Sequence, residues 1–139
     1  NVDLPLKDRH KRIKKSKSSL SVSIHFNAFG DGETYNSARG IEIYTHDQYM
    51  GDSEELAQKV LAYMKEGRQE GKAKILSADF AMTNTQKMNT NASILVECAY
   101  MTNLYEMEYL MANEDFWMET AIQIAKGICE YKGVTYIEE

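Results

Sequence analysis

Alternating polar and apolar residues mark the first strand that the sequence predicts, over residues 20–26. In the segment SVSIHFNAFG (21–30), Val22, Ile24 and Phe26 fall on one face of a strand, where they would pack into a core. His25 and Asn27 fall on the opposite face with small polar residues, at the far end of the strand. A strand with a continuous apolar face therefore carries, near its carboxyl end, two polar side chains that could bind a metal or a ligand.

Three further segments have strand patterns. Residues 40–46 (GIEIYTH) place Ile41 and Ile43 on one face, after a loop over 29–40 that is rich in glycine and polar residues. Residues 93–98 (SILVEC) form a short apolar run, which is typical of a strand buried on both faces. Residues 134–137 (VTYI) predict a final strand.

Helical spacing separates these strands. A first helix follows Pro5, with Leu6, His10 and Ile13 on one face. A second begins at Ser53 as its N-cap and closes at Gly67 and Gly71. Its apolar positions recur at helical spacing, and they are Leu56, Val60, Leu61 and Met64.

Two more helices are predicted near the end of the chain. Asn103 and Glu106 form a capping-box pattern for a short helix that runs to Met111. Asn113 caps a longer helix that ends at Lys132–Gly133. Strands that alternate with helices predict an α/β fold, with a twisted, mostly parallel central sheet and helices on both faces.

Composition places the chain among ordinary globular domains. Its 139 residues suit one domain. Apolar residues make up 43% and charged residues 27%, a composition typical of neither disordered proteins nor membrane proteins. No apolar run reaches the roughly 20 residues that a membrane span needs, and the polar, basic start has no signal-peptide pattern. The two cysteines, Cys98 and Cys129, lie in apolar contexts that favour buried free thiols over a disulfide.

Charge is distributed unevenly along the chain. Residues 1–19 carry seven Lys/Arg and two Asp, a net charge of +5, whereas the remainder carries −10. The basic run KDRHKRIKKSK (7–17) could suggest a nucleic-acid surface. No aromatic residues interleave with it and the acidic remainder would repel phosphate, so we expect a solvated helix and no nucleic-acid partner.

Two ionisable residues lie where ligands of open α/β sheets collect, beyond the carboxyl ends of strands. One is His25, and the other is Glu97, which interrupts the apolar run before Cys98. A carboxylate at the end of a buried strand is costly unless a cation or metal compensates it. A structural ion pair for Glu97 and a satisfied core histidine for His25 are the alternatives on the residues alone.

The context of these two residues resembles a known family. The segments SLSVSIHFNAFG, ARGIEIYTH, ASILVECAYMTN and AIQIAKGICEY occur in the order found in zinc-dependent N-acetylmuramoyl-L-alanine amidases of the amidase-3 family, which include bacterial autolysins and phage endolysins. The resemblance extends from about Leu6 to Tyr131, and its most specific parts are SIHFNA and LVECAYMTN. It implies that residues 1–139 are the C-terminal portion of such a catalytic domain.

The resemblance also implies roles for three residues. His25 matches a histidine ligand of the catalytic zinc, and Glu97 matches the glutamate that acts with metal-bound water. Asn27 matches the motif asparagine, for which we expect a contact with the substrate or with the surroundings of the metal. The implied reaction is hydrolysis of the amide between N-acetylmuramic acid and L-alanine in peptidoglycan, which places the protein at the bacterial cell wall.

Two alternatives stay open. The family's other two zinc ligands, a histidine in a G-H-G strand and a glutamate on the following helix, have no match here, so the chain is also compatible with a non-catalytic fragment unable to hold metal. A cysteine hydrolase would use Cys98 with His25. Because neighbouring strand residues face opposite ways, Cys98 should point away from a site that contains Glu97.

Overall fold

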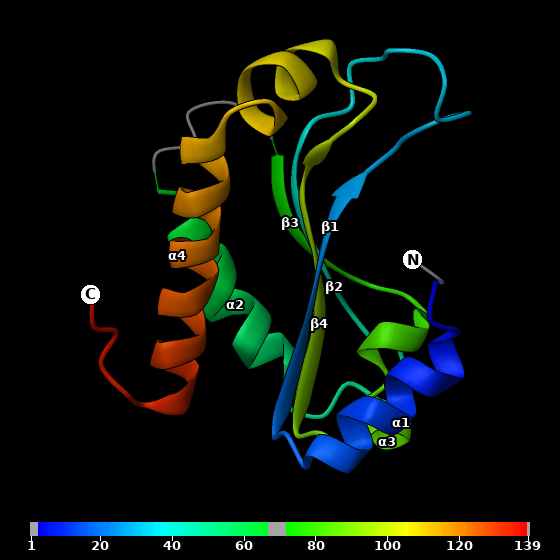
Figure 1. Cartoon of the computed structure of the whole chain (residues 1–139), viewed down its shortest axis with the longest axis vertical. Coiled ribbons are helices and arrows are strands. Elements are labelled where there is room, and N and C mark those ends of the chain that lie inside the picture. The colour runs from blue at the N-terminus through cyan, green and yellow to red at the C-terminus, as the bar shows by residue number, and fades with distance from the viewer. Residues whose placement is uncertain (1–2, 67–71, 139) are drawn as a thin grey trace.

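The central element is a twisted sheet, shown in Figure 1. The computed structural model describes residues 3–66 and 72–138, and in these ranges four strands form one sheet in the order β1-β4-β2-β3. The strands are β1 (Leu20–Asn27), β2 (Gly40–Thr45), β3 (Lys72–Ser77) and β4 (Ala92–Tyr100). β1 pairs in parallel with β4 and β2 with β3, whereas β4 and β2 are antiparallel. The predicted α/β fold with a mostly parallel sheet is confirmed.

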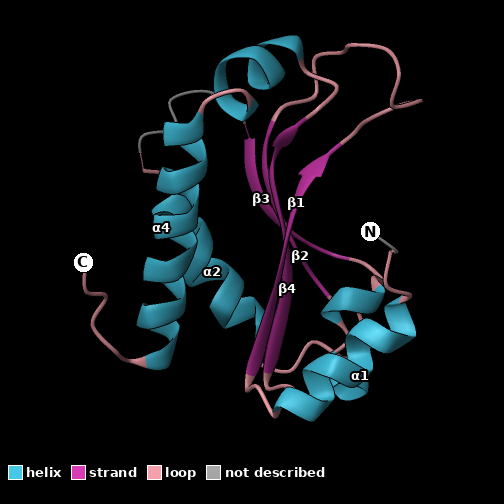
Figure 2. Ribbon diagram, viewed as in Figure 1, coloured by secondary structure: helices cyan, strands magenta, loops and turns pink. Residues whose placement is uncertain are grey.

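Two long helices, α2 (Ser53–Met64) and α4 (Glu114–Lys132), cover one face of this sheet (Figure 2). The core lies between them and the strands, and Ile43, Ile94, Leu56 and Val60 are fully buried there. The helices approach closely at Gly127, where an added Cβ would lie 2.5 Å from the Cα of Val60. These apolar positions are the ones that the periodicity of the sequence predicted.

The opposite face is covered only in part, by α1 (Leu6–Ser16), a 3₁₀ turn η1 (Ala81–Thr83) and the short helix α3 (Thr85–Met88). His10 on α1 lies 2.8 Å, through its Nε2, from the carbonyl oxygen of Ala81. The ring of Phe80, just before η1, packs 4.9 Å from the ring of Tyr44 on β2. These contacts hold α1, η1 and α3 against one end of the sheet, which is opposite the end at which β1 and β4 finish.

The predicted caps near the end of the chain are formed. The Asn103 side chain accepts a hydrogen bond from the backbone N–H of Glu106 at 3.1 Å, and a π-helical segment, η2 (Glu106–Met111), follows. Asn113 caps α4 through the N–H of Asp115, and Gly133 ends that helix with a left-handed φ of 65°. Ser53 differs from its prediction, because it is the first residue of α2 and Asp52 precedes it.

Several other expectations are wrong. Residues 134–137 form no strand, and β3 was not predicted because its sequence, KAKILS, lacks a strong apolar pattern. Ile24 is 57% exposed because β1 is an edge strand of the described sheet, although Val22 and Phe26 do pack against the core. Gly67 and Gly71, predicted to close α2, lie outside the described residues; α2 itself ends at Met64.

Neither cysteine is in a disulfide; Cys98 is buried and Cys129 is half-buried. Among the helices of residues 3–66 and 72–138, none combines the length and apolar character needed to span a bilayer.

Candidate active site

The strand register places four ionisable residues in one row across the sheet. His25 on β1 is the register partner of Glu97 on β4, Glu97 is the partner of Glu42 on β2, and Glu42 is the partner of Lys74 on β3. Residues at matching positions share a face, so all four side chains project from the face opposite α2 and α4. We call His25, Glu97, Glu42 and Lys74 the polar row.

Glu42 is the most connected residue of the row. Its Oε2 accepts hydrogen bonds from the hydroxyl of Tyr44 at 2.8 Å and from the side-chain amide of Asn27 at 3.1 Å. The ammonium group of Lys74 lies 3.3 Å from its Oε1. Burial raises the pKa of Glu42, but hydrogen bonds from Tyr44 and Tyr100 and the charge of Lys74 outweigh this, so the pKa is lowered and the group is a carboxylate at neutral pH.

The bond between Asn27 and Glu42 has a structural consequence. β4 lies between β1 and β2, so this bond passes over β4 and ties together two strands that do not pair with each other. The strand register of β1 shifts between His25 and Asn27, and Asn27 Oδ1 also accepts the N–H of Ala28 at 2.8 Å. Asn27 therefore fixes the end of β1 directly after His25; its predicted contact with substrate stays a prediction.

Glu97 is held in a different electrostatic state from Glu42. Its Oε2 is buried and has no hydrogen-bond partner among the described residues. Burial, followed by repulsion from the Glu42 carboxylate, raises the pKa of Glu97 to about 7. Two adjacent carboxyl groups with pKa values driven apart are a common arrangement for acid–base chemistry, because one can exchange a proton near neutral pH while the other stays charged.

His25 is exposed at the open side of the row. Its Nε2 lies 2.8 Å from the hydroxyl of Ser23, two residues earlier on the same face of β1. An imidazole beside a carboxylate oxygen that lacks a partner is a donor set that zinc accepts. Within the described residues the row offers this one histidine, whereas a catalytic zinc takes about three protein ligands. The row thus fits one side of a zinc site.

Comparison with known proteins identifies the fold and its family. A family model described as N-acetylmuramoyl-L-alanine amidase (Amidase_3) matches residues 1–130. This chain belongs to the Amidase_3 family. No curated protein matches the sequence.

Solved structures of similar proteins support the assignment of this chain to the Amidase_3 family. An N-acetylmuramoyl-L-alanine amidase from Clostridium difficile 630 is 30% identical with a TM-score of 0.79, and the alignment covers 96% of this chain and 68% of that one. The catalytic domain of CwlV, an amidase from Bacillus (Paenibacillus) polymyxa var. colistinus, is 28% identical with a TM-score of 0.76, with coverage of 96% and 69%. This chain therefore spans about two thirds of the length of each.

The sequence identified two residues of the row in this Amidase_3 domain and missed the other two. Glu42 lies between Ile41 and Ile43, so it is a carboxylate within a strand just as Glu97 is, and the same argument about buried charge would have found it. Lys74 could not be placed because β3 was not predicted. No sequence pattern indicated that the Tyr44 and Tyr100 hydroxyls would form hydrogen bonds with Glu42. Burial and the hydrogen bond to Glu42 raise the pKa of Tyr44 to about 12.

A second cluster of possible metal ligands lies at the other end of the sheet. His46, Asp47 and Asp79 are the only group of three or more such residues within the described ranges. His46 is buried; its Nδ1 accepts the backbone N–H groups of Gln48 and Tyr49, and its Nε2 lies 3.1 Å from Asp79. Both ring nitrogens are thus engaged by the protein, and the two aspartates lie at opposite sides of the ring. The cluster fastens the loop after β2 to the loop after β3.

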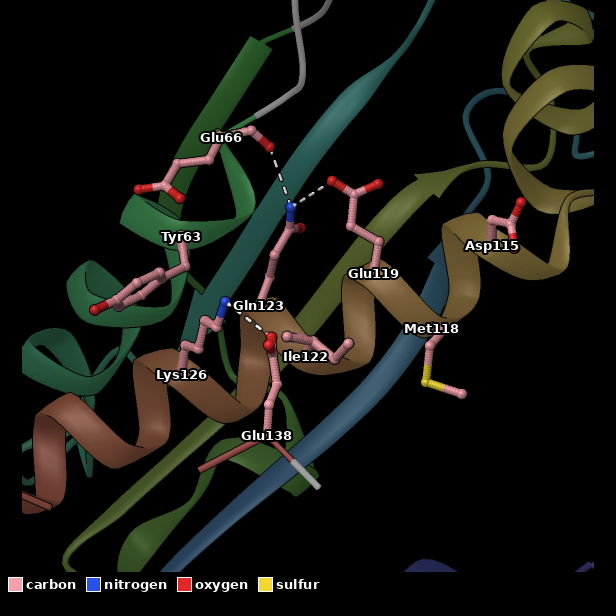
Figure 3. Close-up of a pocket in the computed structure, with 9 residues that line it drawn as sticks. All are labelled: Tyr63, Glu66, Asp115, Met118, Glu119, Ile122, Gln123, Lys126 and Glu138. Atoms are coloured by element: carbon pink, nitrogen blue, oxygen red, sulfur yellow. Dashed lines mark hydrogen bonds and ion pairs between the residues drawn. The ribbon is translucent and has the colours of Figure 1, made fainter. Parts of the chain in front are cut away.

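A cavity of about 460 Å³ lies between α2, α4 and the C-terminal segment (Figure 3). Gln123 spans it, donating to the carbonyl oxygen of Glu66 and to the carboxylate of Glu119, and Lys126 approaches Glu138 at its other side. This cavity is on the helical layer, with the sheet between it and the polar row. None of the row residues lines it, so it is separate from the candidate active site.

Proposed function

We propose that this chain is the C-terminal part of a zinc-dependent N-acetylmuramoyl-L-alanine amidase. It would hydrolyse the amide that joins the lactyl group of N-acetylmuramic acid to L-alanine in peptidoglycan, and it would therefore act at the bacterial cell wall. The observation that carries the proposal is the pairing of His25 with Glu97. Glu97 has a pKa of about 7 and a buried oxygen without a hydrogen-bond partner among the described residues, and both properties suit a general base. Family membership supplies the substrate class.

In this mechanism His25 holds the metal, and Glu97 moves protons. The zinc that His25 would help to hold would supply Lewis acidity toward water and the scissile carbonyl. Glu97 accepts the proton of the attacking water through the carboxylate oxygen that has no partner within the described protein. It then delivers that proton to the leaving nitrogen of L-alanine, which departs as an amine.

Other residues in the row and beside it support Glu97. Glu42 stays charged because Tyr44, Asn27 and Lys74 surround it, and its negative charge raises the proton affinity of Glu97. Asn27 keeps the end of β1 in place, and Ser23 holds the His25 ring on the face of the row. Each of these residues acts by positioning or by charge and makes no contact with the reacting bond in this scheme.

The experiment is digestion of purified peptidoglycan with analysis of the products by mass spectrometry. The proposal predicts new L-alanine amino groups together with free muramic lactyl carboxylates, and it predicts that Glu97→Gln abolishes both. Cleavage between sugars or within the peptide would contradict the assigned bond.

A non-catalytic, wall-associated role is the second candidate, and one observation favours it. The described residues provide a single histidine beside Glu97, which is too few ligands for a catalytic zinc. Metal analysis separates the two candidates. A longer version of the protein, extended upstream in its gene, should hold about one zinc per chain with an intact His25, and absence of zinc there would overturn the amidase proposal.

A further inference from the structure

The helix α1 carries a dense group of cations that neither the fold nor the site uses. Lys7, Lys11, Arg12, Lys14 and Lys15 are exposed, and Lys17 follows at the end of the helix. Lys11 pairs with Asp8, and Arg9 with Asp3, both at the surface. The remaining exposed cations have no carboxylate within ion-pair distance among the described residues. We call Lys7, Arg12, Lys14, Lys15 and Lys17 the basic ridge.

Burial does not explain the ridge. No residue of α1 is buried, and the helix is attached to the body chiefly through α3, η1 and the contact of His10 with Ala81. A helix that only completed the core would bury an apolar stripe. Here most of the helix is exposed, and five of its seven exposed residues are cations; the other two are Leu6 and Ser16.

The ridge shares a face with the candidate active site. α1 lies with η1 and α3 on the face of the sheet from which the polar row projects, while α2 and α4 lie on the other face (Figure 1). His25 and Glu97 lie near the carboxyl ends of β1 and β4, whereas α1 lies toward the start of β1, at the other end of the same face. A polymer lying across this face would meet both.

Electrostatics make such a ridge useful toward an anionic polymer. Residues 20–139 carry a net charge of −10, so without residues 1–19 the domain would be repelled by any negatively charged substrate. Peptidoglycan is negatively charged because its stem peptides bear free carboxylates. A positive surface on the face that holds the site would both attract this polymer and orient the domain upon it.

We propose that the basic ridge of α1 binds the stem-peptide carboxylates of peptidoglycan, as a substrate-docking surface at the other end of the face that carries the polar row. This inference rests on the proposed function for the identity of the polymer. Charge complementarity favours peptidoglycan over nucleic acid, because the ridge contains no aromatic side chain on which bases could stack and the acidic body would repel a phosphate backbone.

The test compares two variants of equal net charge. Replacing Arg12, Lys14 and Lys15 by Gln removes three ridge cations while keeping good helix formers in place. The control replaces three lysines of the opposite layer by Gln: Lys59 on α2, Lys65 at the end of α2 and Lys126 on α4. Binding to insoluble peptidoglycan, freed of phosphate-containing polymers, is measured by sedimentation at low and high salt without added metal.

We expect the ridge variant to bind about five- to tenfold more weakly than the unmodified protein at low salt, because three exposed charge contacts are lost. The control should bind within about twofold of the unmodified protein. The difference should shrink at high salt because screening removes surface attraction. Circular dichroism of both variants checks that α1 stays folded.

Equal weakening by the two variants would overturn the proposal, since it would show a general charge effect. The proposal would also be overturned if the protein bound tightly only to walls that keep their phosphate-containing polymers. It would be overturned as well if the ridge gave a higher affinity for 30-base-pair DNA than for peptidoglycan. Because binding is read without metal and without cleavage, it is independent of the amidase test. Loss of cleavage with intact ridge-dependent binding would count against the proposed function alone.

Discussion

His25 and Glu97 are register partners on the adjacent parallel strands β1 and β4, and both side chains leave the same face of the sheet. Parallel pairing of the two strands brings them together although they are 72 positions apart in the chain. Glu42 extends the same row from the antiparallel strand β2. The arrangement of the candidate site therefore depends on backbone register.

Glu97→Gln should remove the hydrolytic activity of the zinc-loaded protein while preserving the fold. The amide cannot accept the proton of water, and general base catalysis is worth about 10²–10⁴-fold in rate. Product release from peptidoglycan measures the rate, and circular dichroism measures the fold. Glu33→Gln, in the exposed loop after β1, is the matched control and should leave the rate unchanged.

The stability of the metal-free protein should depend on Glu97 in a defined pH window. Burial raises the pKa of Glu97 from 4.5 to about 7, so between these values the folded state binds a proton that the unfolded state has released. This contribution to stability is present at low pH and is lost as the pH rises through about 7. Urea unfolding of the unmodified protein and of Glu97→Gln from pH 5 to 8 should show a decline that the variant lacks; parallel profiles would contradict the raised pKa.

Glu42→Gln should lower the pKa of Glu97. Removing the neighbouring negative charge removes the second cause of the shift, while the burial of Glu97 is unchanged. The acidic limb of the pH–rate profile should move to lower pH, and the carboxyl carbon signal of Glu97 should titrate at lower pH in the metal-free protein. An unchanged titration would show that the Glu42 carboxylate does not act on Glu97.

Glu106→Ala should destabilise the fold strongly. The Glu106 carboxylate is buried and accepts the backbone N–H of Gly40 at 3.0 Å and that of Tyr100 at 2.8 Å, so it joins the start of β2 to the end of β4. Leaving two buried donors without an acceptor costs about 2–5 kcal/mol in the free energy of unfolding. Urea unfolding measures this cost. Glu108→Ala, exposed on the same π-helical segment, should change stability by less than about 0.5 kcal/mol.

Cys98→Ala should keep hydrolytic activity. Cys98 is 1% exposed and belongs to the core cluster beneath α2 and α4, on the face opposite Glu97. Loss of the buried sulfur should cost about 1–2 kcal/mol of stability without reaching the site. If this variant lost peptidoglycan cleavage and Glu97→Gln retained it, the cysteine-hydrolase alternative would be right.

Much of the fold follows from local patterns. The alternation around Val22, the apolar run before Glu97 and the caps at Asn103 and Asn113 are features of neighbouring residues, so the sequence alone predicts the elements that they begin or form. It fails at β3, whose residues pair with β2 without a strong apolar pattern of their own, and at residues 134–137, where a β-prone sequence has no strand to pair with in the described sheet. Strand formation depends on such partners, which local sequence does not specify.

The sequence by itself determined the family, the fold class and the two residues, His25 and Glu97, on which the proposed chemistry depends. Only the tertiary structure decided the strand order β1-β4-β2-β3, and with it the row that joins these residues to Glu42 and Lys74. It also decided which carboxylate is surrounded by donors and which has a buried oxygen without a partner among the described residues. The reason is physical: a pKa depends on burial and on charges a few ångströms away, and those neighbours come from strands far apart in the chain.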